Sequence, residues 1–159
     1  MSRPKDSAGF TLIELMVVVA LLVIFASFAL PGFSQLVKAN RVQSTASELA
    51  TFLQYARSEA VTRNVDITAA ASNGVWSIKQ GSTTLRVLDN QQSALSIQPA
   101  TVTLTFYPNG TASASTSIYV CQGDDTSTGY LLSVKASGQI KLWPRGKESA
   151  TTPLGSCGT

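Results

Sequence analysis

The chain has 159 residues, of which 44% are hydrophobic and only 13% are charged, and its formal net charge is +3. This length allows one modest hydrophobic core plus an appendage, and the charge predicts no strong field for nucleic acid or acidic lipid. The sequence contains no histidine, so it lacks the commonest general base and the commonest metal ligand. It also offers no paired carboxylates in an apolar setting and no glycine-rich phosphate loop. We therefore expect no enzyme, no cofactor and no metal site.

The first element expected along the chain is a long apolar helix. Residues 15–30 are apolar except for Ser27, and no charged residue occurs between Glu14 and Lys38. Together with residues 10–14 they give roughly the 20 residues that a membrane-spanning helix needs. A carboxylate at the head of such a helix costs about 3 kcal/mol in lipid on insertion scales. Glu14 therefore either marks the membrane boundary or requires a partner.

Three interpretations compete for this segment. A conventional signal peptide would be cleaved near Ser27-Phe28-Ala29, but it leaves Glu14 and the continuing helical pattern unexplained. A simple membrane anchor for an exported domain is the second interpretation. The third rests on a resemblance: Gly9-Phe10-Thr11-Leu12-Ile13-Glu14, followed by the apolar run, resembles the class III leader of type IV pilins and type II secretion pseudopilins.

That resemblance assigns a role to each end of the motif. It implies that a prepilin peptidase removes residues 1–9 by cutting after Gly9, and that the new N-terminal Phe10 is N-methylated. The leader holds two basic residues and one acidic residue, so the mature chain would carry a charge of +2. In this family the residue matching Glu14 pairs with the N-terminal amine of a neighbouring subunit. Opposite charges attract far more strongly in a low-dielectric helix bundle than in water, which agrees with an assembly role for Glu14.

The helical pattern continues beyond the apolar run. Pro31 removes a backbone donor, and we expect a kink there rather than an end. From Phe33 onward, apolar residues recur at helical spacing to about Arg63, which predicts a stripe facing a sheet. The residues of this stripe are Leu36, Val37, Val42, Ala46, Leu49, Phe52, Leu53, Ala56 and Ala60. We expect residues 10–30 to be the transmembrane and polymerisation helix and residues 31–64 its amphipathic continuation.

Residues 65–159 change to short runs rich in Val, Ile, Thr and aromatic residues, which predict antiparallel strands. We expect turns at 108–110 and 136–138, an exposed loop at 123–129, and a tail from Lys147 that is poorly ordered except where Cys157 anchors it. The fold class is thus α+β, a type IV pilin fold in which a long kinked N-terminal helix packs on a C-terminal β domain. The strands are expected near residues 65–70, 75–79, 84–88, 94–97, 102–107, 117–121, 130–135 and 139–143.

Two further features of this β-rich head invite a chemical interpretation. Cys121 and Cys157 lack the CxxC spacing of a metal or redox site. In an exported domain they would most simply form a disulfide, and two buried thiols are the alternative. Asp124 and Asp125 are oxygen ligands suited to calcium, but without EF-hand spacing we expect a solvated turn.

Three segments resemble the GspH and FimT family of minor pilins and pseudopilins, namely residues 55–64, 106–110 and 134–138. Residues 40–44, residues 57–64 and the two cysteines are most similar to the FimU group within it. The resemblance implies a minor pilin that primes polymerisation in a tip complex, supporting twitching motility, adhesion and DNA uptake. Its partners would be the major pilin, other minor pilins, the prepilin peptidase and an inner-membrane assembly platform. The protein would span the inner membrane once, with its head in the periplasm, before joining the pilus.

Two alternatives to this function stay open. A minor pseudopilin of type II secretion shares every feature above. Direct DNA binding is known for FimT relatives with a Gly-Arg-x-Arg motif, but residues 138–141 read Gly-Gln-Ile-Lys here. The basic residues left as weak DNA-contact candidates are Lys135, Lys141, Arg145 and Lys147, and we do not expect nucleic acid to be a partner.

Overall fold

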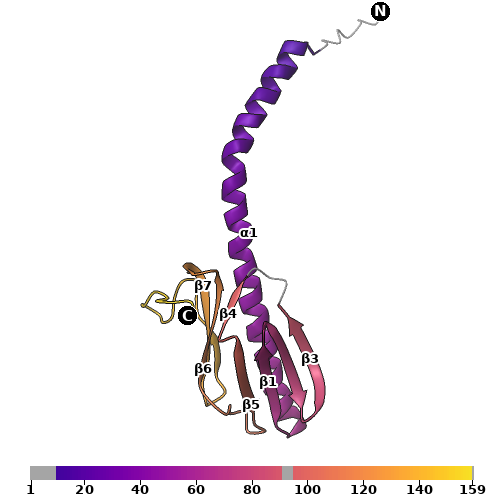
Figure 1. The fold of residues 1–159 in the computed structure, drawn as a ribbon, viewed down its shortest axis with the longest axis vertical. Coiled ribbons are helices and arrows are strands. Elements are labelled where there is room, and N and C mark those ends of the chain that lie inside the picture. The colour runs from indigo at the N-terminus through magenta and orange to yellow at the C-terminus, as the bar shows by residue number, and fades with distance from the viewer. Residues whose placement is uncertain (1–9, 91–94, 159) are drawn as a thin grey trace, which may run out of the picture. The chain divides into compact units, whose positions relative to one another are not determined.

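The computed structural model describes residues 10–90 and 95–158, apart from the side chains of Ala26 and residues 28–32. It divides into two compact units, Met1–Val37 and Lys38–Thr159. Within the described residues, one α-helix, α1 (Leu12–Arg63), precedes eight strands. The strands gather around the C-terminal part of this helix (Figure 1).

Helix α1 begins at Leu12 because Thr11 caps it. The backbone N–H of Glu14 donates to Thr11 Oγ1 at 3.3 Å, and that of Leu15 donates to Thr11 O at 3.2 Å. A threonine followed three residues later by glutamate is the spacing of a capping box, and an acidic side chain in the first turn is favoured by the helix dipole. The helix continues through Pro31, so the prediction that this proline does not end it is confirmed.

The apolar side chains at the start of α1 are exposed in the first unit, with Leu12 77% and Phe25 70% accessible. In the part of the chain that the structure describes, no helix combines the length and apolarity needed to cross a membrane. The predicted membrane segment, residues 10–30, includes Ala26 and residues 28–30, whose side chains lie outside that description.

The C-terminal end of α1 is capped by a backbone motif that was not predicted from the sequence. Asn64 has a φ of 54°, and the N–H of Val65 donates to Ala60 O at 3.3 Å. A left-handed residue followed by this return bond is a Schellman motif, which satisfies helix-end carbonyls. Arg63 in the last turn forms an ion pair with Glu59, and a cation there suits the helix dipole.

The strands form two four-stranded antiparallel sheets. The first sheet has the order β3-β2-β1-β5 and the second β4-β6-β7-β8. The α+β class and the pilin-like arrangement predicted from the sequence are confirmed. The strands run over β1 (Ile67–Ser72), β2 (Val75–Gln80), β3 (Thr83–Asp89), β4 (Ser96–Gln98), β5 (Thr101–Phe106), β6 (Thr116–Gln122), β7 (Asp125–Val134) and β8 (Ile140–Leu142).

One core in the second unit joins the helix to both sheets. Leu49 and Leu53 of α1 are fully buried with Trp76 and Leu104 of the first sheet and Leu132 of the second. Burying a side chain of this size stabilises a fold by roughly 1.5 to 3 kcal/mol. The predicted stripe is confirmed in the second unit, where its buried members are Val42, Ala46, Leu49, Phe52, Leu53, Ala56 and Ala60.

Two expectations about irregular segments are wrong. Residues 123–129 are not one loop, because β7 already begins at Asp125, which pairs with Gln122 of β6; only residues 123–124 turn. The tail is not poorly ordered, because Leu154 is buried beside the second sheet and its N–H donates to Gly146 O at 2.8 Å. In both segments hydrogen bonds hold the backbone in a defined conformation, which the amino-acid composition alone did not indicate.

Candidate functional site

The predicted leader site sits at the edge of the described residues. Gly9 lies outside them, while Phe10 is 76% exposed just ahead of α1. Glu14 is also exposed. Within residues 10–90 and 95–158, the ion pair that the structure contains joins Arg63 to Glu59. Glu14 therefore has no ionic partner among these residues. Its proposed pairing with a neighbouring subunit stays a prediction.

The structure adds a local role for Thr11, at the backbone of Glu14, that the sequence interpretation missed. The backbone N–H of Glu14 is held by Thr11 Oγ1, so the motif that precedes the apolar run also starts the helix. The Thr-x-x-Glu spacing was the available signal. A carboxylate in the first turn is also stabilised by the positive end of the helix dipole.

A second candidate site lies where the three family-like segments of the head meet. Arg57 Nε, on α1, donates to Gly110 O at 2.8 Å across 53 residues of sequence. A Cβ on Gly138 would lie 1.8 Å from Gly110 O and 2.9 Å from Arg57 Nε. Both glycines have a positive φ, 79° and 78° respectively. A side chain is therefore excluded at Gly138 by contact as well as by conformation.

This junction ties the helix to both sheets. Gly110 belongs to the turn after β5 of the first sheet, and its N–H donates to Tyr107 O at 2.8 Å. Gly138 belongs to the turn between β7 and β8 of the second sheet. The two connections are joined directly, since Ala112 N–H donates to Ala136 O at 2.9 Å. The arginine thus holds a point at which the two sheets contact each other.

The four basic candidates for DNA contact are all exposed, and they belong to different local structures. Lys135 closes the β7–β8 turn, with its N–H donating to Gln139 O at 2.9 Å. The ammonium group of Lys141 lies 3.4 Å from the centre of the Trp143 ring, a cation–π arrangement. Arg145 and Lys147 belong to the following segment, in which Lys147 N–H donates to Pro144 O. Two of the four are thus linked by the β7–β8 hairpin and two follow it.

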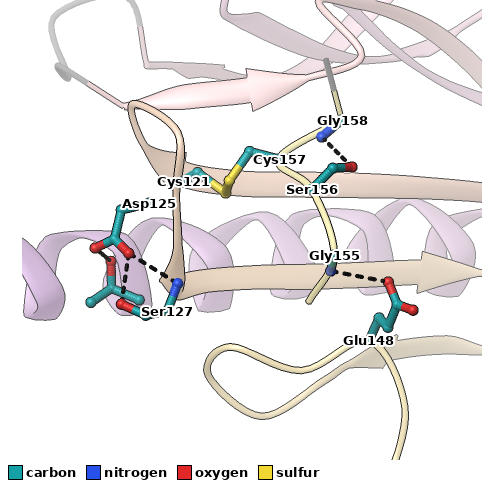
Figure 2. Close-up of a disulfide and its surroundings, with 9 residues drawn as sticks. Cys121, Asp125, Ser127, Glu148, Gly155, Ser156, Cys157 and Gly158 are labelled. Atoms are coloured by element: carbon teal, nitrogen blue, oxygen red, sulfur yellow. Dashed lines mark hydrogen bonds between the residues drawn. A yellow bond between two sulfur atoms is a disulfide. The ribbon is translucent and has the colours of Figure 1, made fainter. Parts of the chain in front are cut away.

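The predicted disulfide is present, and it ties the tail to the second sheet (Figure 2). Cys121 of β6 and Cys157 are bridged with an S–S distance of 2.07 Å. Both are buried together with Leu131 and Leu154. Figure 2 also shows the tail bonded to itself, with Gly155 N–H donating to Glu148 Oε2 at 3.4 Å.

The aspartate pair near this bridge shapes a turn. Asp125 accepts hydrogen bonds from the hydroxyl groups of Ser127 at 2.6 Å and Thr128 at 2.7 Å. These bonds, that of Ser127 first, lower the pKa of the Asp125 carboxyl below its ordinary value of 3.8. Among the described residues, no three acidic or sulfur side chains gather in a way that would hold a metal.

Comparison with known proteins places this arrangement in a family. Residues 4–30 match the family described as Prokaryotic N-terminal methylation motif, and residues 45–138 match that described as Type II transport protein GspH. A crystal structure of the Pseudomonas aeruginosa type IV minor pilin FimU is similar at 33% identity and a TM-score of 0.62, covering 74% of this chain and 96% of that one. Another crystal form of FimU is similar at 32% identity and a TM-score of 0.60, covering 72% of this chain and 98% of that one. Curated protein sequences give no match.

A methylation motif ahead of a long helix that packs on antiparallel sheets defines the class of type IV pilin-like proteins. Because the GspH match spans more than half of its residues, the chain belongs to the GspH and FimT family of minor pilins and pseudopilins. This is a family of structural subunits, and membership implies assembly with other pilins and with the machinery that builds them into filaments. The predicted resemblance to FimU is confirmed.

Proposed function

We propose that the chain is a minor pilin of a type IV pilus that primes polymerisation as part of a tip complex. The observation that carries this proposal is the likeness to the type IV minor pilin FimU at 33% identity over 96% of that chain. Twitching motility, adhesion and DNA uptake would follow from the pilus it helps to start. Its partners would be the major pilin, other minor pilins and the inner-membrane assembly platform.

In this proposal the N-terminal segment performs the assembly. A prepilin peptidase cuts between Gly9 and Phe10, Phe10 is methylated, and residues 10–30 hold the subunit in the inner membrane before it joins the filament. Support comes from the match of residues 4–30 to the methylation motif. The exposure of Glu14, which has no ionic partner in the described residues, agrees with a partner on another subunit.

Replacement of Glu14 tests this assembly step. Glu14→Ala should leave leader cleavage and membrane insertion intact but reduce the amount of subunit in sheared pili at least about tenfold, since a buried amine loses its counter-charge. Glu48→Ala, which removes an exposed carboxylate from the same helix, is the matched control and should behave as the unmodified chain. Equal incorporation of both variants would refute the role of Glu14.

A minor pseudopilin of type II secretion is the second candidate, favoured by the match of residues 45–138 to the GspH family. Deleting the gene in its own bacterium separates the two. Loss of surface pili with normal release of type II substrates supports the pilus function. Normal piliation with a loss of secreted substrates supports the pseudopilin and overturns the first proposal.

A further inference from the structure

The outward side of α1 in the head carries a groove that the assembly role of the N-terminus does not use. It has a volume of about 340 Å³ and is lined by Gln54, Arg57, Ser58, Val61 and Thr62. The turn that follows β5 borders it, because a Cβ on Gly110 would lie 3.3 Å from Arg57 Nη2 and 3.5 Å from Val61 Cγ2. The groove therefore lies at the junction of the three family-like segments.

Arg57 is held in place but leaves most of its hydrogen-bonding capacity unused. Its Nε is bound to Gly110 O at 2.8 Å, which fixes the plane of the guanidinium. In the described part of the chain, no carboxylate lies within ion-pair distance of it. An arginine orientated in this way presents its terminal N–H groups as a rigid fork, the geometry that binds a carboxylate with two parallel hydrogen bonds.

One lining residue of the groove and one residue of the turn that borders it expose apolar surface. Val61 is 51% exposed, and Tyr107, which starts the bordering turn, is 36% exposed. Among the described residues of the second unit, one further large apolar side chain, Val87, is exposed to an extent similar to that of Val61. Arginine and tyrosine are enriched among the residues that dominate interface energies, and apolar neighbours exclude water from such charged contacts.

The charges around the groove select one kind of occupant. Its lining residues include one cation, two hydroxyl groups and one amide, and no acidic residue. A carboxylate would meet attraction without opposing repulsion, whereas a basic side chain would be repelled by Arg57.

We infer that the groove beside Arg57 is a docking site for an aspartate or glutamate side chain of a neighbouring pilin subunit. This inference rests on the proposed function, because assembly brings a neighbouring subunit against the head. It extends that function by naming a second contact, between heads, in addition to the contact made by the N-terminal helix. The inference also assigns the junction of the two sheets a role in subunit contact, in addition to its role in stabilising the head.

Photo-crosslinking of the full-length chain in piliated cells tests the inference. A photoreactive amino acid is introduced at Thr62 in the groove, at Leu22 in the N-terminal segment, or at Thr84 on β3 as an exposed control. We expect the Thr62 probe to capture another pilin through a peptide that contains Asp or Glu, and the Thr84 probe not to capture it.

A charge added to the groove makes the test specific. Gln54→Glu places a carboxylate in the groove beside Arg57, and Gln43→Glu makes the same change on an exposed part of α1 outside the groove. We expect Gln54→Glu to lower the Thr62 crosslink by about tenfold or more, because like charges facing each other disfavour binding. Gln43→Glu should leave the crosslink unchanged.

Each other outcome has a definite meaning. Crosslinks from Leu22 without any from Thr62, a Thr62 crosslink that Gln54→Glu does not change, or a captured peptide without an acidic residue each overturn the docking site while the proposed function stands. Absence of crosslinks to pilins from both Leu22 and Thr62 overturns the proposed function together with the docking site.

Discussion

Replacing Gly138 by alanine measures what holds the two sheets and the helix together. The added Cβ would lie 1.8 Å from Gly110 O, so one of the two turns must move by more than an ångström. That movement breaks the hydrogen bond from Arg57 Nε to Gly110 O. A hydrogen bond to a charged group contributes about 1.5 to 3 kcal/mol. A positive φ costs a non-glycine residue about 1 to 2 kcal/mol more.

The head of the chain, from Lys38 onward, is suited to this measurement because it contains both buried apolar clusters and forms one compact unit. We expect Gly138→Ala to lower its free energy of unfolding by about 2.5 to 5 kcal/mol, or its melting temperature by roughly 10 to 20 °C. Thermal and urea unfolding followed by circular dichroism would give both values.

Gly81→Ala is the matched control, since Gly81 has a φ of 57° and a Cβ there would meet nothing within 4 Å. It should cost only the conformational part, about 1 to 2 kcal/mol. In an Arg57→Ala background, the excess cost of Gly138→Ala over Gly81→Ala should shrink, because the bond is already lost. Equal costs for the two glycine variants in the unmodified head would refute the reasoning.

Three further predictions concern the head. Replacing both Cys121 and Cys157 by serine opens a loop with a sequence separation of 36 and should cost about 4 kcal/mol on the loop-entropy description; unchanged urea unfolding would contradict this. Asp125→Ala should destabilise the head at neutral pH, and the difference from the unmodified head should shrink as the pH falls below the ordinary carboxyl pKa of 3.8 and through the lower pKa of the folded head, because the hydrogen bonds favour the ionised form. A difference that does not shrink between about pH 4 and pH 2 would contradict that cause. In a gel-shift titration at low salt the head should not retard DNA, since residues 138–141 lack the two arginines of the Gly-Arg-x-Arg motif; clear retardation that is lost in Lys135→Ala would reverse this expectation.

The strands were predictable because each is encoded locally. Every predicted run of residues overlaps a strand of the structure, since β-branched and aromatic residues bounded by glycine, asparagine or proline mark strands and turns. The loop expected at 123–129 was wrong because the first half of β7 is polar. Its order comes from hydrogen bonds between Asp125, Ser127 and Thr128, which alternation of apolar residues does not reveal. Leu154, a single apolar residue in a polar tail, gave too weak a signal to predict its burial.

The division into two sheets and the junction at Arg57 depend on contacts between distant residues. The pairing of β1 with β5 joins residues that are 29 (Ser72 and Thr101) to 39 (Ile67 and Phe106) positions apart, and no local pattern specifies it. The three family-like segments were recognised individually, but their meeting point required the Arg57–Gly110 bond, which spans 53 residues. The start of α1, in contrast, depends on residues close together in sequence. The three-residue spacing of Thr11 and Glu14 was enough to indicate where the helix begins.

The bridge between Cys121 and Cys157 also governs what happens if the backbone is cut. Any single proteolytic nick between residues 122 and 156 leaves two fragments that stay covalently linked. The segment around Leu154 then remains seated on the second sheet, and the nicked protein separates into two pieces only after a reducing agent is added. A subunit built in this way can be clipped by a protease in this segment without losing its C-terminal end.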